Sequence, residues 1–157
     1  MSAPNTPDQP MMAELLAAYL ATGYRLTLPG PDGATLALRV GRRHPGLDRW
    51  LVRHHPGVSD WTWLTAVNPR SRPLGRAANL QRLTDLVAAL AAAGFDCCPG
   101  LARDPTGRWP DEASVFVPGM KAATGCDWGR RFEQHAILAG AIGRAARLWL
   151  CGPPAPA

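Results

Sequence analysis

The sequence contains no apolar run that approaches the roughly 18 residues of a membrane-spanning helix. The N-terminus also lacks a basic region, and its apolar stretch at residues 15–20 is too short for a secretory signal peptide. These absences argue against membrane insertion and against secretion. We therefore expect a cytoplasmic protein without a membrane partner.

Familiar catalytic motifs are also missing. The sequence has no G-x-S-x-G elbow, no phosphate-binding P-loop and no H-E-x-x-H zinc motif. The histidines His44, His54, His55 and His135 include no i, i+4 pair that would place two ligands on one helix face. We predict no metal and no cofactor, and the sequence leaves open whether the protein is an enzyme.

Cysteine is scarce, with four residues and no C-x-x-C spacing. Cys97 and Cys98 are adjacent, and adjacent cysteines rarely bridge because the geometry of a disulfide disfavours it. Together with Cys126 and Cys151 they are expected to be free thiols in a reducing compartment.

Lysine is nearly absent, since Lys121 is the only lysine among 17 basic residues. The formal net charge of +5 is compatible with an anionic partner. However, the arginines are spread along the chain in runs of at most two, which favours a solvated basic surface. Nucleic acid is therefore a partner that the sequence permits but does not favour.

The length and composition of the chain predict one folded domain. A chain of 157 residues with 46% hydrophobic residues suits a single globular domain with its own core. Residues 11–151 are expected to form this domain. The proline-rich ends, 1–10 and 152–157, are expected to be disordered tails.

The N-terminal part predicts a helix, a hairpin and a second helix. Apolar residues recur at helical spacing over residues 11–21. Two short strands at 24–28 and 35–40 flank a Pro-Asp-Gly turn, which is a strong hairpin signal. The second helix is expected to begin near Pro45, because proline is favoured in the first helical turn.

Residues 60–140 alternate between strand and helix patterns. The expected elements are a strand at 60–67, a helix at 76–93, strands at 95–99 and 114–119, a helix at 120–132 and a strand at 134–140. Residues 100–113 between the two middle strands are expected to be a turn-rich loop. This order predicts an α+β fold with a ferredoxin-like βαββαβ core and both helices on one face of the sheet.

The C-terminal part has two interpretations. Residues 134–140 and 146–151 are apolar and resemble two strands joined by a turn at Gly143. The same region is rich in alanine, which favours one continuous helix over 136–150. The sequence leaves a β-hairpin and a helix both open.

The stretch "VNPRSRPL" at residues 67–74 is the first candidate site. Two prolines stiffen it, so a simple turn explains many of its residue types. Yet Asn68 and Ser71 precede a predicted helix start, Asn79 lies one turn inside the helix, and Arg72 adds charge. Because helix N-termini and arginines favour anions, we predict that this corner binds a small anionic ligand or a nucleotide.

A second interpretation centres on Glu112. This residue precedes the predicted strand that contains Ser114, and Gln134 lies at the start of a later strand. In the alternative hypothesis the protein is a small enzyme in which Glu112 acts as base or acid, while Asn68, Ser71 and Gln134 position a substrate. The neighbouring Asp111 is expected to point away from Glu112 on an extended chain.

Three segments together resemble the bacterial family known as domain of unknown function three-two-nine-three. They are "TAVNPRSRPLGRAANLQRL" (65–83), "PGLARDPTGRWPDEASVFVPG" (99–119) and "GRRFEQHAIL" (129–138). The resemblance implies no activity, but it emphasises Asn68, Pro69, Ser71, Asn79, Trp109, Glu112, Ser114, Phe132 and Gln134. The chain departs from the family at Gly75, which stands for a serine, and at 133–135, which read Glu-Gln-His instead of Gly-Gln-Asn.

The candidate functions fall into four classes. Ligand binding at residues 68–79 is the leading hypothesis, and an enzyme using Glu112 is the second. An RNA-binding module is the third, although no strand carries the aromatic pattern of common RNA-binding sheets. A protein-interaction domain is the fourth, and the sequence does not predict the oligomeric state.

Overall fold

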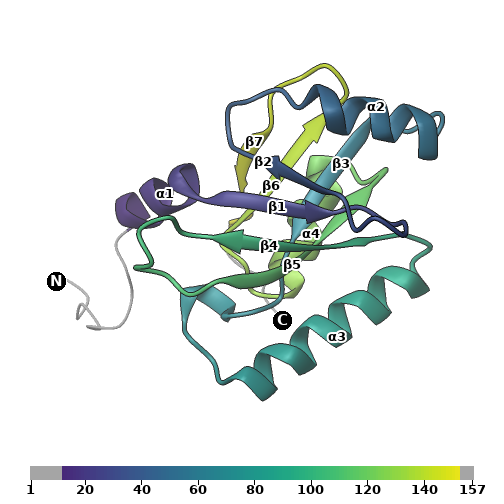
Figure 1. Cartoon of the computed structure of the whole chain (residues 1–157). Helices are drawn as coiled ribbons and strands as arrows, with labels where there is room; N and C mark the ends of the chain where they lie inside the picture. Colours follow the sequence, from purple (N-terminus) through teal and green to yellow (C-terminus); the bar gives the residue numbers. More distant parts are fainter. Residues whose placement is uncertain (1–11, 153–157) are drawn as a thin grey trace, which may run out of the picture.

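The computed structural model describes residues 12–152 (Figure 1). The helices are α1 (Met12–Ala21), α2 (Pro45–His54), α3 (Arg76–Ala92) and α4 (Ala122–Arg131), with a short 3-10 turn η1 (Pro69–Ser71). The strands are β1 (Gly23–Thr27), β2 (Thr35–Leu38), β3 (Asp60–Leu64), β4 (Cys98–Arg103), β5 (Glu112–Pro118), β6 (Ala136–Ala141) and β7 (Arg147–Leu150). The predicted tails at 1–10 and 152–157 lie outside the described residues, apart from Gly152.

All seven strands join one antiparallel sheet in the order β2-β1-β4-β5-β3-β6-β7. The sheet curls so that its two outer strands approach each other (Figure 1). At one end the curl is fastened by backbone hydrogen bonds: Gly41 N–H donates to Ala146 O at 2.8 Å, and Ala146 N–H donates to Arg42 O at 2.9 Å. The sheet is therefore a half-barrel with an inner and an outer face.

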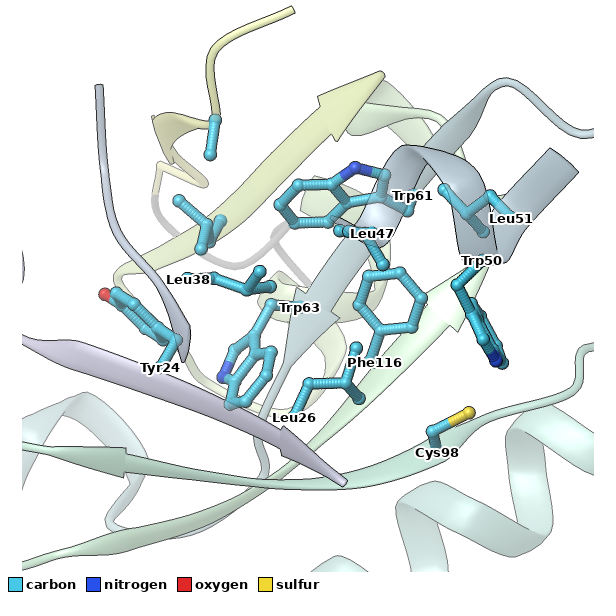
Figure 2. Packing of buried hydrophobic residues seen from close by; sticks show 12 residues of the cluster. Tyr24, Leu26, Leu38, Leu47, Trp50, Leu51, Trp61, Trp63, Cys98 and Phe116 are labelled. Carbon is cyan, nitrogen blue, oxygen red and sulfur yellow. The ribbon is translucent and has the colours of Figure 1, made fainter. Parts of the chain in front are cut away.

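The inner face is rich in aromatic side chains. Trp61 and Trp63 of β3 project to this face together with Phe116 of β5, because alternate residues of a strand share a face. Figure 2 shows α2 contributing Leu47, Trp50 and Leu51 to the same cluster. Helix α2 thus fills one end of the curled sheet.

The outer face is aliphatic and is covered by two helices. Leu86 and Leu90 of α3 and Cys126 of α4 pack with strand residues such as Val115 and Ile137 in a second buried cluster. Both helices that connect the central strands therefore lie on one side of the sheet, as the sequence predicted. The apolar positions of β3 and β5 are divided between the two clusters, since both faces of these strands are buried.

Two glycines allow tryptophan rings to lie directly against the sheet. A Cβ atom at Gly100 would be 2.2 Å from the Trp63 ring, and one at Gly140 would be 2.4 Å from the Trp61 ring. No side chain fits at such distances, so both positions require glycine unless the rings move. The two tryptophan rings occupy the space that side chains at these two positions would need.

The α+β prediction is confirmed, as are the N-terminal helix, the hairpin and the second helix. The region 136–150 is the β-hairpin formed by β6 and β7, so the continuous-helix interpretation is wrong. All four cysteines are free thiols. In residues 12–152 there is no helix long and apolar enough to cross a membrane.

One strand was misplaced by the sequence interpretation. A strand was predicted at 95–99 and a loop over 100–113, whereas β4 runs from Cys98 to Arg103. Gly100 and Ala102 look like loop residues, but they are the small residues that face Trp63 and Glu112 across the sheet. Strand β3 is also shorter than predicted, since it ends at Leu64 instead of Val67.

Candidate functional site

A cavity of about 90 Å³ is lined by α1 and by one end of the strands, and no residue of α2 lines it. This volume exceeds the roughly 10–15 Å³ that one buried water needs, so the cavity has room for a small molecule. Strand β3 ends here, whereas β5 and β6 begin here. The polar side chains of the lining are Tyr19, Thr22, Tyr24, Trp63, Thr65, Asn68, Ser71, Asp104, Trp109, Glu112, Ser114 and Gln134.

Glu112 is the central ionisable group of the cavity. It is the first residue of β5 and lies on the same face as Ser114 and Phe116. Its partner across the sheet is Ala102, whose small side chain leaves space above the carboxyl. Burial raises the pKa of Glu112 to about 7, and the hydrogen bond from Asn68 opposes this rise. Both protonation states are therefore accessible at neutral pH.

Asn68 holds one oxygen of that carboxyl. Its Nδ2 donates to Glu112 Oε1 at 3.3 Å, while its Oδ1 accepts from Leu74 N–H at 3.1 Å and from Asn79 Nδ2 at 2.8 Å. The backbone N–H of Asn68 donates to Asn79 Oδ1 at 2.9 Å. With its Oδ1 occupied by two donors, Asn68 can only present Nδ2 to Glu112.

The loop that carries Asn68 has an uncommon backbone. Asn68, Arg70 and Ser71 have φ values of 47°, 53° and 57°, in the left-handed region that residues with a side chain rarely adopt. Arg70 N–H donates to Glu133 O at 2.7 Å, and the two side chains form an ion pair at 3.8 Å. Such conformations persist only where the surroundings enforce them.

Gln134 and Arg82 fasten the same loop from two other elements. Gln134 Nε2 donates to Val67 O at 3.1 Å and to Phe132 O at 3.2 Å. Arg82 of α3 donates to Ala66 O at 2.6 Å and to Phe132 O at 2.7 Å. The segment after β3 is thus clamped between α3 and the start of β6, which fixes the position of Asn68 relative to Glu112.

Aromatic residues form the walls of the cavity. Tyr24 and Trp63 meet edge to face with ring centroids 5.4 Å apart (Figure 2). The Tyr24 hydroxyl donates to Tyr19 O at 3.5 Å. Burial raises the pKa of Tyr19 to about 12; the Glu112 carboxylate adds to the rise, and the nearby Ser71 side chain opposes it. Burial also raises the pKa of Tyr24, so both tyrosines are neutral hydrogen-bonding groups at physiological pH.

Asp104 is the second carboxylate of the lining, but its oxygens are occupied. It accepts hydrogen bonds from Thr106 N–H at 3.0 Å, Thr106 Oγ1 at 2.7 Å and Trp109 N–H at 3.0 Å. The hydrogen bonds from Thr106 lower the pKa of Asp104. This carboxylate therefore organises the 104–109 turn and places Trp109 at the cavity, whereas Glu112 is the group able to exchange a proton.

The lining contains no arginine, lysine or histidine within residues 12–152. Arg72 is exposed and lies outside the cavity. In the same described part of the chain, no cluster of three or more potential metal ligands is found. The site combines carboxyl, amide and hydroxyl groups with aromatic surface.

Five of the seven residues proposed from the sequence line the cavity: Asn68, Ser71, Glu112, Ser114 and Gln134. The other two do not. Asn79 lies behind Asn68 and orients its amide, and Arg72 faces solvent. Asp111 points away from Glu112 and pairs with Arg103 at 3.1 Å, as expected for neighbours on an extended chain.

Sequence reasoning missed Tyr19, Tyr24 and Trp63. Tyr19 lies in the apolar pattern of the first helix, and the other two alternate with outward-facing residues on their strands. Their pattern indicates burial, but it does not reveal that one edge of each ring borders a cavity. Tyr24 reaches Glu112 through the register of the sheet, since Tyr24 pairs with Ala102 and Ala102 pairs with Glu112.

Comparison with known families identifies one match. Residues 64–137 match the family model described as "Protein of unknown function (DUF3293)". This segment is thus similar to that family, and it includes most of the three segments that carry the resemblance in the sequence. No curated protein and no solved structure matches the chain.

The DUF3293 segment does not contain the whole cavity. It holds Asn68, Glu112 and Gln134, which form the polar side of the site. Tyr19, Tyr24 and Trp63 precede it in the chain and supply most of the aromatic side. The candidate site is therefore assembled from residues inside and outside the segment that matches the family model.

Proposed function

We propose that this protein is a small enzyme that binds a compact, uncharged or cationic molecule and exchanges a proton with it through Glu112. The observation that supports this most strongly is a buried carboxyl facing an aromatic-walled cavity, held by one amide donor. A group with a pKa of about 7 is suited to act as acid or base at neutral pH. Perturbed carboxyls in clefts are frequent at functional sites.

The surrounding residues would have distinct roles in such a reaction. Asn68 engages Glu112 Oε1 and leaves Oε2 to face the ligand. Gln134 has its Nε2 committed to backbone oxygens, so its carbonyl oxygen is the group it can offer as an acceptor. The Ser71 hydroxyl lines the same cavity and adds a group that both donates and accepts.

The geometry favours this enzyme hypothesis over the anionic ligand predicted at residues 68–79. An anion in the cavity would lie near Glu112 and Asp104 with no cationic side chain in the described lining to compensate. A neutral molecule avoids that repulsion. A cationic amine would gain an ion pair with Glu112 and contacts with aromatic faces.

The ferredoxin-like description of the core is likewise a proposal. Strands β4, β5, β3 and β6 lie in the order that a βαββαβ unit requires, and α3 and α4 pack on one face. On this view the unit is extended by β1 and β2 on one side and by β7 on the other. The extension produces the curl that encloses the cavity.

The test combines titration with a ligand screen. The pKa of Glu112 is measured by NMR on ¹³C-glutamate-labelled protein, and a library of small amines and neutral metabolites is screened by thermal shift. Hits are then compared between wild type, Glu112→Gln and the exposed control Asp111→Asn. We expect Glu112→Gln to abolish stabilisation and Asp111→Asn to preserve it.

Catalysis is tested on the same hits. Each stabilising compound is incubated with protein in D₂O, and incorporation of deuterium at carbon or conversion to product is followed by mass spectrometry. Turnover that is lost in Glu112→Gln supports the proposal. Ligands that bind equally well to Glu112→Gln, or a Glu112 that titrates like an exposed glutamate, would overturn it.

A further inference from the structure

A second hollow lies at the opposite end of the central strands. It is bordered by Asp60, the first residue of β3, by Ala141, the last residue of β6, and by Ala122 at the start of α4. Its volume is about 450 Å³, which falls within the roughly 300–1,000 Å³ typical of small-ligand sites. We call it the arginine groove, after Arg43, Arg144 and Arg147 in its lining.

The three arginines of the groove are exposed. Among the ion pairs of residues 12–152, none involves these three side chains. Asp60 is the carboxylate that shares the groove with them, so the local charge remains positive. The backbone bonds that join Gly41 and Arg42 to Ala146 hold the two arginine-bearing loops side by side.

An aromatic surface lies next to this charge. Trp149 follows Arg147 by two residues on β7, so both side chains project from the same face of that edge strand. Trp149 is 43% exposed, which is unusual for a large apolar residue in a protein whose other strand tryptophans are buried. A flat ring beside guanidinium groups can stack on a planar ligand.

We propose that the arginine groove binds a nucleotide, with its phosphates on Arg43, Arg144 and Arg147 and its base against Trp149. Guanidinium forks match phosphate oxygens in pairs, which a solvated amine does less well. Inorganic phosphate alone would offer no planar group to stack on Trp149. The site is independent of the Glu112 cavity, because no residue lines both.

The experiment is a calorimetric titration with ADP at fixed ionic strength. Arg147→Ala is compared with Arg25→Ala, which removes the same charge from an exposed position on β1 outside the groove. We expect Arg147→Ala to weaken ADP binding by roughly tenfold or more and Arg25→Ala to change it less than about twofold. Trp149→Ala should also weaken binding, and Trp149→Phe should retain most of it.

Four results would overturn the proposal: no measurable ADP binding, equal losses in Arg147→Ala and Arg25→Ala, inorganic phosphate binding as tightly as ADP, or binding of a short single-stranded RNA without binding of ADP. Glu112→Gln is the variant that distinguishes this proposal from the enzyme proposal. We expect it to leave ADP affinity unchanged, so a failure of the enzyme proposal and a failure of this one produce different results.

Discussion

The two hollows at opposite ends of the strands share β3, β6 and β7 but differ in chemistry. The Glu112 cavity is small, aromatic and without cationic side chains in its described lining, whereas the arginine groove is larger, open and positive. Beyond the cavity the inner face is filled by Trp61, Phe116 and the side chains of α2, whereas Arg147 and Trp149 of the groove lie on the outer face, opposite Ala139 and Ile137. Glu112 at the enclosed end is desolvated and its pKa is raised, whereas the arginines of the open end remain exposed to solvent.

The largest expected effect concerns the aromatic cluster that fills the inner face beyond the Glu112 cavity. Phe116 is fully buried, with its ring centroid 5.3 Å from that of Trp61 and 6.4 Å from that of Trp50. Phe116→Ala should lower the free energy of unfolding by about 3–5 kcal/mol, because it removes buried surface and leaves a void. The exposed Leu80→Ala should change it by less than about 0.5 kcal/mol in the same urea titration. A comparable small loss for Phe116→Ala would contradict the packing described above.

The next effect tests how the Glu112 cavity is held. Asn68→Ala removes the acceptor of Leu74 N–H and Asn79 Nδ2 and should destabilise the protein by roughly 2–3 kcal/mol. It also removes the donor to Glu112, so the pKa of Glu112 should rise further in an NMR titration. Asn68→Gly loses the same bonds but tolerates φ of 47°, so it should be less destabilised than Asn68→Ala. Equal losses would show that the backbone conformation contributes little.

The raised pKa of Glu112 predicts how the free energy of unfolding depends on pH. Its folded-state pKa of about 7 lies above its ordinary value of 4.5, so the folded state binds more protons between these values. Stability should therefore fall as the pH rises from about 4.5 to 7, by roughly 1–2 kcal/mol after allowing for partial solvent access. Urea titrations across this range should show that Glu112→Gln lacks this fall and exceeds wild type above pH 7. A profile shared by both proteins would contradict this assignment.

The smallest expected effect concerns the stability of variants in the arginine groove. Arg147 is exposed and belongs to none of the ion pairs of residues 12–152, so Arg147→Ala should change the free energy of unfolding by less than about 0.5 kcal/mol. Groove variants should thus alter binding without altering stability, whereas cavity variants should alter both. Thermal unfolding of the two sets of variants without ligand checks this difference. A large loss in Arg147→Ala would indicate an unrecognised structural role for this residue.

Local patterns were sufficient for most elements of the fold. The Pro-Asp-Gly turn and the proline at the start of α2 each mark an element boundary that the structure confirms. Strand β4 was misplaced because Gly100 and Ala102 are small to accommodate side chains on neighbouring strands. That requirement exists only in the folded sheet and leaves no local signal.

The sequence also predicted only part of the candidate site, because some of its contacts exist only in the folded sheet. Polar residues at strand ends, such as Asn68, Glu112 and Gln134, stand out in the sequence and do converge. Arg72 was included because arginines near a helix start suggest an anion, but its side chain faces solvent. Most of the aromatic walls come from α1, β1 and β3, and their approach depends on the strand order β1-β4-β5-β3, which the local sequence does not encode.

The division of the cavity between two parts of the chain has a consequence for how selectivity can change. The buried carboxyl and its amide partners lie within residues 64–137, whereas Leu15, Tyr19 and Tyr24 of the opposite wall lie outside. Substitutions in α1 and β1 therefore reshape the ligand space while the Asn68–Glu112 pair stays in place. Replacing residues 12–28 as one segment would therefore change which ligands bind. Glu112, the group that exchanges the proton, would stay the same.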